Sequence, residues 1–186
     1  MQVETTKKLF TVDEYYRMAE AGILKPEDRV ELIDGEIIEM SPIGNRHLGC
    51  VNRATRLFAS AFGNRVVVSV QNPLRLSNYT EPEPDVVLLK PRSDDYASKT
   101  PAADDALLVL EVAEATLAYD RDVKVPRYAA AGVPEVWIEN LRDDLLLVYR
   151  NPSGAAYTTS LALRRGDSIA PVALADVVFA AEELLV

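Results

Sequence analysis

The segment Ala106–Ala113 places one acidic side chain, that of Glu111, inside a short run of mostly branched aliphatic residues. Such a run is typical of a strand that is buried on both faces. An unpaired carboxylate would be unfavourable there, since burying even an uncharged polar group without a partner costs ~2–7 kcal/mol. We therefore expect an arginine, a hydrogen-bond network or a metal ion to compensate Glu111.

Two further segments favour a metal ion as the partner of Glu111. Upstream, Asp85 stands at the head of a second apolar run, Val86–Leu89. Downstream, Lys124 follows the Glu111 strand after a short connection. An Asp, a Glu and a Lys that two strands and a following helix bring together suit a divalent-metal site for phosphodiester hydrolysis.

The ligands of such a metal would be oxygen atoms. The chain has one cysteine, Cys50, and one histidine, His47, which excludes a zinc site of the Cys/His type. Carboxylate oxygens are the ligands that hard cations prefer. The sequence therefore predicts Mg²⁺ or Mn²⁺ as the cofactor.

Length and composition indicate an ordinary globular protein. With 186 residues, 48% of them hydrophobic, the chain is expected to form a single domain over residues 1–186 with a full core. No apolar stretch approaches the ~18–20 residues that span a bilayer, so no membrane partner is expected. The first eight residues lack the hydrophobic segment of a secretory signal, and the lone Cys50 excludes an internal disulfide. Together these features predict a cytoplasmic location.

The charge is distributed unevenly along the chain. The net charge is −9, yet residues 40–80 contain no acidic residue and five arginines. These arginines are Arg46, Arg53, Arg56, Arg65 and Arg75. These arginines either form a basic surface that binds the phosphates of a nucleic acid or pair with the protein's own carboxylates. Both interpretations are open at this point.

Helices and strands are expected to alternate along the chain. A capped helix over 11–22 precedes a hairpin over 30–40 that turns at Asp34-Gly35, and an amphipathic helix follows over 47–62. The later elements are a strand over 65–71, the Asp85 and Glu111 strands, a helix over about 120–131, strands over 135–139 and 145–150, and a further strand or two around 157–163 and 169. This order predicts an α/β fold with a mixed sheet.

Four segments resemble a known family. They are residues 31–42, 81–87, 110–113 and 119–137, of which the last is the most specific. Together they resemble the Uma2 family of the restriction-endonuclease-like PD-(D/E)XK superfamily, over residues 10–180 or so. The resemblance implies a three-layer α/β/α core with a central mixed sheet, preceded here by the N-terminal helix and hairpin.

The resemblance also implies the roles of individual residues. Asp85 and Glu111 match the two metal-binding acids of the superfamily. Its lysine usually stands two residues after the second acid, where this chain has Ala113. In the Uma2 pattern the lysine has moved to the next helix, where Lys124 stands. The departure is geometrically reasonable, because a helix packed on the sheet can direct a long side chain back to the strand ends.

The expected chemistry follows from these assignments. Asp85, Glu111 and the Val112 carbonyl would hold Mg²⁺ or Mn²⁺. Lys124 would orient the attacking water or stabilise the transition state, a contribution of ~2.7–4 kcal/mol for one well-placed donor. Pro126 removes one helical hydrogen bond and could kink the helix, so the direction of Lys124 is left open.

Several other residues are candidates for secondary roles. Glu36 and Glu39 could add a carboxylate to the metal shell, although hairpin acids usually face solvent. Gln71 would either hydrogen-bond a metal-bound water or cap its strand. His47 is expected to contact phosphate or lie on the surface rather than act as the general base. The fork of the Arg121 guanidinium suits phosphate contacts.

Two classes of function remain open. The first is a metal-dependent endonuclease that acts on nucleic acid, with DNA as the expected partner. The second is a non-catalytic nucleic-acid-binding or protein-interaction module on the same fold. Asp85, Glu111 and Lys124 favour the first, whereas the acidic composition and the lack of a DNA-reading motif favour the second. A homodimer would supply the two sites that cutting both strands of a duplex requires.

Overall fold

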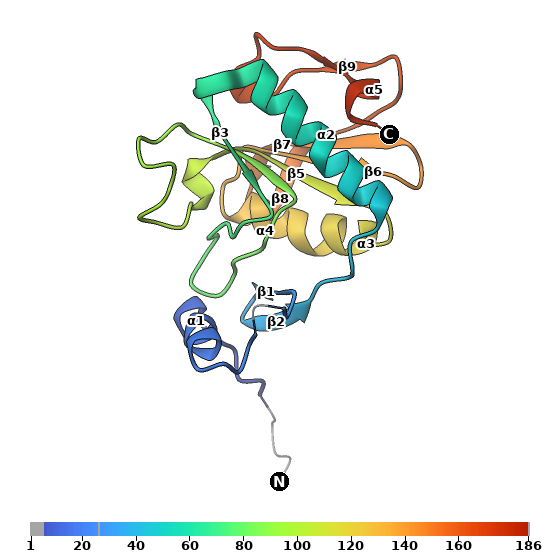
Figure 1. Ribbon diagram of the computed structural model, residues 1–186. Helices are drawn as coiled ribbons and strands as arrows, with labels where there is room; N and C mark the ends of the chain where they lie inside the picture. The colour runs from blue at the N-terminus through green and yellow to red at the C-terminus, as the bar shows by residue number, and fades with distance from the viewer. Residues whose placement is uncertain (1–5, 26, 186) are drawn as a thin grey trace.

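A six-stranded sheet forms the centre of the computed structural model, which describes residues 6–25 and 27–185 (Figure 1). Its strands are β3 (Val67–Val70), β4 (Val86–Leu89), β5 (Ala106–Ala113), β6 (Glu135–Asn140), β7 (Leu145–Ser153) and β8 (Ala156–Leu163), which lie side by side in this order. Strands β5 and β6 are parallel, and the other neighbours are antiparallel. The predicted mixed sheet is therefore confirmed.

Helices cover both faces of this sheet, as the resemblance implied (Figure 1). One face carries α2 (Asn45–Phe62), together with α5 (Ala181–Leu184) and the two-stranded sheet of β9 (Ser168–Ile169) and β10 (Phe179–Ala180). The other face carries α3 (Leu117–Tyr119), the π-helical segment η3 (Asp120–Lys124) and α4 (Val125–Ala130). Short 3₁₀ helices are η1 (Gly63–Arg65), η2 (Ala103–Asp105) and η4 (Val172–Leu174). Among the described residues, no helix is long and apolar enough to cross a membrane.

Side chains of β5 alternate between the two layers of the core, because successive residues of a strand point to opposite faces. Leu108 and Leu110 pack in the cluster that contains Phe58 of α2. Val109 packs instead in the cluster that contains Tyr128 of α4. Glu111 has the same parity as Val109 and therefore points toward the α4 layer.

The N-terminal part of the chain forms the predicted helix and hairpin. Helix α1 (Val12–Glu20) begins with a capping box between Thr11 and Glu14. The hairpin consists of β1 (Val30–Ile33) and β2 (Glu36–Glu39), joined at Asp34-Gly35 as expected. Gly35 has φ +78°, and a Cβ there would lie 2.7 Å from Leu9 Cβ, so only glycine fits. The Glu81 N–H donates to the Leu32 carbonyl at 2.7 Å, which connects the hairpin to the loop between β3 and β4.

The helix expected over 120–131 begins earlier and is irregular. It starts at Leu117 and contains the π-helical segment η3 before Pro126. Proline has no N–H to donate to the carbonyl four residues before it. The residue before it, Val125, donates its N–H to the Asp120 carbonyl, five residues back. This turn therefore contains one residue more than an α-helical turn, which makes it a π-turn. The chain thus accommodates Pro126 without ending the helix.

Two of the five arginines between residues 40 and 80 pair with carboxylates of the protein. Arg65 makes a bidentate ion pair with Asp176, with distances of 2.7 and 2.8 Å. Arg75 bonds to the buried Glu81. For these two side chains the structure supports internal pairing rather than a phosphate footprint.

The core also contains an acid that lies outside the cavity described below. Glu139 of β6 is fully buried and shares its face of the strand with Trp137, toward α2. Within the described part of the chain, neither of its carboxylate oxygens finds a hydrogen-bond partner. Burial therefore raises the pKa of Glu139 to about 8.

This buried acid predicts a pH-dependent stability. Between pH 4.5 and 8 the unfolded chain ionises Glu139 while the folded protein keeps the proton, so the free energy of unfolding should fall as pH rises, by up to ~1.4 kcal/mol per pH unit. Glu139→Gln should remove this part of the fall. Denaturant unfolding at pH 5 and pH 8 measures it, with Glu20→Gln on the surface of α1 as the control. A difference between wild type and Glu139→Gln that is the same at both pH values would contradict the prediction.

Candidate active site

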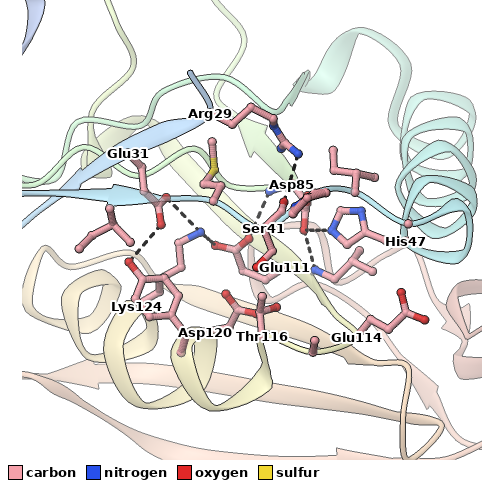
Figure 2. A pocket seen from close by; sticks show the side chains of 18 of the residues that line it. Arg29, Glu31, Ser41, His47, Asp85, Glu111, Glu114, Thr116, Asp120 and Lys124 are labelled. Atoms are coloured by element: carbon pink, nitrogen blue, oxygen red, sulfur yellow. Dashed lines mark hydrogen bonds and ion pairs between the residues drawn. The ribbon is translucent and has the colours of Figure 1, made fainter. Parts of the chain in front are cut away.

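The antiparallel pairing of β4 with β5 brings Asp85 and Glu111 together. Val86 pairs with Leu110, so Asp85, one residue before β4, lies beside Glu111. The Asp85 N–H donates to Glu111 Oε2 at 3.3 Å. Figure 2 shows both carboxylates in one cavity, with Lys124 approaching from the helix below the sheet. The three residues predicted from sequence are therefore neighbours.

Three other parts of the chain contact the Asp85 carboxylate. Gln71, which follows β3, donates from Nε2 to Oδ1 at 3.2 Å. The Val112 N–H donates to Oδ2 at 2.8 Å, and His47 Nε2 of α2 lies 3.0 Å from the same oxygen. Burial opposes protonation of His47, but the hydrogen bond and charge of Asp85 raise its pKa above the usual value. His47 is therefore a part-buried partner of Asp85, and its contact with phosphate stays a prediction.

Glu111 is buried, with 2% of its surface exposed, and it receives the compensation that its position requires. Tyr128 donates its O–H to Oε1 at 2.6 Å, and Lys124 Nζ lies 3.0 Å from the same oxygen. Burial raises the pKa of Glu111 above its usual value and Asp120 and Asp85 add to this, whereas Lys124 and the Tyr128 hydrogen bond lower it. The carboxylate thus sits in a crowded acidic site.

Lys124 bridges two buried acids. Its Nζ lies 3.3 Å from Glu31 Oε2 as well as 3.0 Å from Glu111. Glu31 also accepts from the Tyr119 O–H at 3.2 Å and the Glu83 N–H at 3.1 Å. Burial alone would lower the pKa of Lys124, but the two carboxylates raise it above the usual value. The lysine is therefore a fixed positive charge between the hairpin and the sheet (Figure 2).

Three site residues, Asp120, Tyr128 and Glu31, were not anticipated from the sequence. Asp120 is buried and accepts from Thr116 Oγ1 at 2.6 Å; its burial raises its pKa. Asp120, Lys124 and Tyr128 recur every fourth residue, a spacing that places them on one helix face and could have signalled a shared site. Glu31 had a weaker signal, an acid within the apolar hairpin strand 30–33.

Other candidate residues lie outside this group. Glu36 bonds to Lys7 at 2.7 Å on the surface. Arg121 pairs with its neighbour Asp122 at 2.7 Å and is exposed. Neither side chain lines the cavity, whereas Glu39 lines it without a contact to Asp85 or Glu111.

The site lies in a cavity of about 400 Å³ between the hairpin and the end of the sheet. In the described ranges, no three acidic, histidine or cysteine side chains converge closely enough to hold a metal ion by themselves. Mg²⁺, however, is commonly held by one or two carboxylates, with water and substrate phosphate completing its shell. The adjacent carboxylates of Asp85 and Glu111 fit that donor set. Val112 lines the cavity, and the role of its carbonyl stays a prediction.

Comparisons with known proteins agree with this architecture. The profile of the Uma2 family, described as "Putative restriction endonuclease", matches residues 12–182, and the chain therefore belongs to the Uma2 family. A crystal structure from Anabaena variabilis, described as "a putative nuclease belonging to DUF820", has a similar fold with a TM-score of 0.75. The two chains are 14% identical over 95% of this chain and 97% of the other. No curated protein matches the sequence.

Two lysines form ion pairs with acids of the hairpin, Lys124 with the buried Glu31 and Lys7 with the exposed Glu36. They allow a matched test of how much the buried ion pair stabilises the fold. Lys124→Met would leave Glu31 and Glu111 buried without their cation, and it should lower the free energy of unfolding by ~3–5 kcal/mol at neutral pH. Lys7→Met removes the exposed partner of Glu36 and should cost at most ~1 kcal/mol. Denaturant unfolding of both variants makes the comparison, and equal losses would show that the Lys124 bridge contributes no more than a surface pair.

Proposed function

We propose that the protein is a metal-dependent endonuclease that hydrolyses phosphodiester bonds of DNA. Membership of the Uma2 family and the restriction-endonuclease-like fold support a nuclease. The observation that carries the proposal is the convergence of Asp85, Glu111 and Lys124 in one cavity. Buried ionisable groups whose pKa values are shifted by burial and by one another cluster at functional sites, so their convergence in a cavity favours a functional site.

Asp85 and Glu111 would be the metal ligands. A bound Mg²⁺ or Mn²⁺ would polarise the phosphate and lower the pKa of a water. His47 and Gln71 orient the Asp85 carboxylate through their hydrogen bonds, and Tyr128 does the same for Glu111. The Val112 carbonyl would face the same ion as a third oxygen donor.

Lys124 would supply positive charge where the phosphoryl oxygens become more negative. Its Nζ donates to Glu111 and Glu31 in the free protein, and the raised pKa keeps it protonated. A donor held in place before the reaction needs no reorganisation during it. Lys124 would orient the attacking water or stabilise the transition state, and Arg121 would contact phosphate farther from the cavity.

The wider parts of the proposal follow from the same chemistry. We propose that residues 1–186 act as a single domain in the cytoplasm, where the buried Cys50 stays a free thiol. A homodimer would place two sites on the two strands of a duplex.

One observation favours the alternative of a non-catalytic module. Protein groups already satisfy both acids, since Asp85 accepts from Gln71 and Val112 and meets His47, and Glu111 meets Lys124 and Tyr128. Such a network could have a purely structural role. A binding module of this kind would show no response to metal and would bind nucleic acid with a strong salt dependence.

Calorimetric titration with Mn²⁺ distinguishes the two functions without knowledge of the substrate. We expect wild type to bind Mn²⁺, and Asp85→Asn and Glu111→Gln to lose binding, because each removes an anionic ligand. Glu114→Gln is the matched control, since Glu114 lines the same cavity but is exposed. The titration is repeated with a non-cleavable oligonucleotide, because phosphate oxygens complete the metal shell.

Cleavage of DNA in Mg²⁺ or Mn²⁺ is the second readout. The two ligand variants should lose cleavage by at least ~10²-fold, and Glu114→Gln should keep it. Identical Mn²⁺ titrations for all four proteins, with no cleavage by any of them, would reject the endonuclease in favour of the binding module.

A further inference from the structure

The hairpin contributes an apolar wall to the cavity. Ile38 of β2 pairs across the hairpin with Glu31, so both face the cavity, whereas Ile37 pairs with Leu32 on the other face. Beyond β2, the segment 40–43 lines the cavity with Met40, Pro42 and Ile43. Ile43 is 36% exposed, so part of its side chain is open to a ligand. An apolar surface therefore faces the acids and Lys124 across the same space.

The cavity is thus divided by chemistry. The Asp85, Glu111 and Lys124 end suits a phosphate group with its cation. Arg29 lines the cavity too, with its guanidinium 3.3 Å from the Ser41 carbonyl (Figure 2). The hairpin end combines the apolar side chains of Ile38, Met40, Pro42 and Ile43 with the polar Glu39 and Ser41, so it suits a group with an apolar face and polar edges. A ligand that fills both ends must carry a phosphate and an apolar face within a few bonds of each other.

The size of the cavity limits what can occupy it. Its volume of about 400 Å³ is at the lower end of the ~300–1,000 Å³ typical of small-molecule sites. Glu111 and Lys124 lie at its floor with 2% and 5% exposure. A DNA duplex presents sugars and phosphates outward while its bases stay stacked inside. A paired strand would therefore leave the hairpin's apolar wall without a partner.

We propose that the cavity takes an unpaired nucleotide of a nucleic-acid strand, with its phosphate at Asp85 and Glu111 and its base against Ile38 and Met40. This inference rests on the proposed function and names its substrate class. Bases offer a π-face to apolar and aromatic side chains whatever their sequence, and Tyr119 lines the cavity as well. A base inside a duplex would first have to leave its stack, which favours single-stranded regions, flaps and ends. One protomer is sufficient to cut such a strand.

Binding of three fluorescent oligonucleotides tests the proposal without requiring cleavage. The probes are a single strand without self-complementarity, the same strand annealed to its full-length complement, and a single strand of the same length with abasic sites in place of bases. Fluorescence anisotropy is measured in Ca²⁺, an oxygen-seeking cation that carboxylates bind. We expect the single strand to bind at least tenfold more tightly than either of the other probes. The abasic probe isolates the contribution of the base from that of the phosphates.

Two isoleucines of one strand provide a matched pair of variants. Ile38→Ala should weaken single-strand binding toward the level of the abasic probe and leave abasic binding unchanged. Ile37→Ala, on the opposite face of β2, should leave both unchanged. Met40→Ala provides a second variant of the apolar wall, outside the regular hairpin pairing, and should act as Ile38→Ala does.

The outcomes separate this inference from the proposed function. Equal affinity for the single strand, duplex and abasic probes would overturn the unpaired-nucleotide site, and so would cleavage of duplex and single strand at equal rates in Mg²⁺; in the latter case the nuclease would stand. A base-dependent preference for single strands that Ile38→Ala removes would support the site. If the same protein also showed identical Mn²⁺ titrations for wild type and the ligand variants and cleaved no probe, the site would stand and the catalytic role would be overturned.

Discussion

The burial of Glu111 in the middle layer of the fold is the constraint on which the rest of the structure depends. A carboxylate that is only 2% exposed needs hydrogen-bond or ion-pair partners, and other elements of the chain must supply them. Lys124 and Tyr128 supply them from the helix that follows β5, and Asp85 supplies its N–H from the neighbouring strand. The position of that helix on the sheet is therefore coupled to a polar contact as well as to apolar packing.

The same constraint reaches the N-terminal hairpin. Lys124 carries one charge and faces two acids, so Glu31 closes the network from a part of the chain 93 residues away. Glu31 is in turn held by Tyr119 and by the Glu83 N–H. The hairpin is thereby docked over the strand ends, and the space it leaves becomes the cavity. Its lining, with Asp85, Glu111 and Lys124 at the sheet and both apolar and acidic residues on the hairpin, is a consequence of this docking.

Much of this arrangement could be predicted because the signals are local. The short apolar run of 106–113 and the turn at Asp34-Gly35 identify strands without any knowledge of their neighbours. Lys124 could be linked to Glu111 through its family pattern, yet its direction depended on how Pro126 was accommodated. The π-turn settles that question, and no local propensity signals it. Glu36 and Glu31 occupy the same hairpin with similar neighbours, and the sequence favoured Glu36, which the structure pairs with the exposed Lys7.

The sequence by itself determined the α/β class and the acidic residue that could not remain unpaired. With one histidine and one cysteine, it also restricts the metal that we propose to oxygen ligands. Each of these depends on residue type and on short-range periodicity. The tertiary structure alone decided that Glu31, His47 and Gln71 join Asp85, Glu111 and Lys124, and that the hairpin forms a wall of the cavity. Those contacts join segments separated by 14 to 93 residues. Their formation depends on how the apolar faces of separate elements dock against one another, and no pattern within a single segment specifies the partner of a polar side chain.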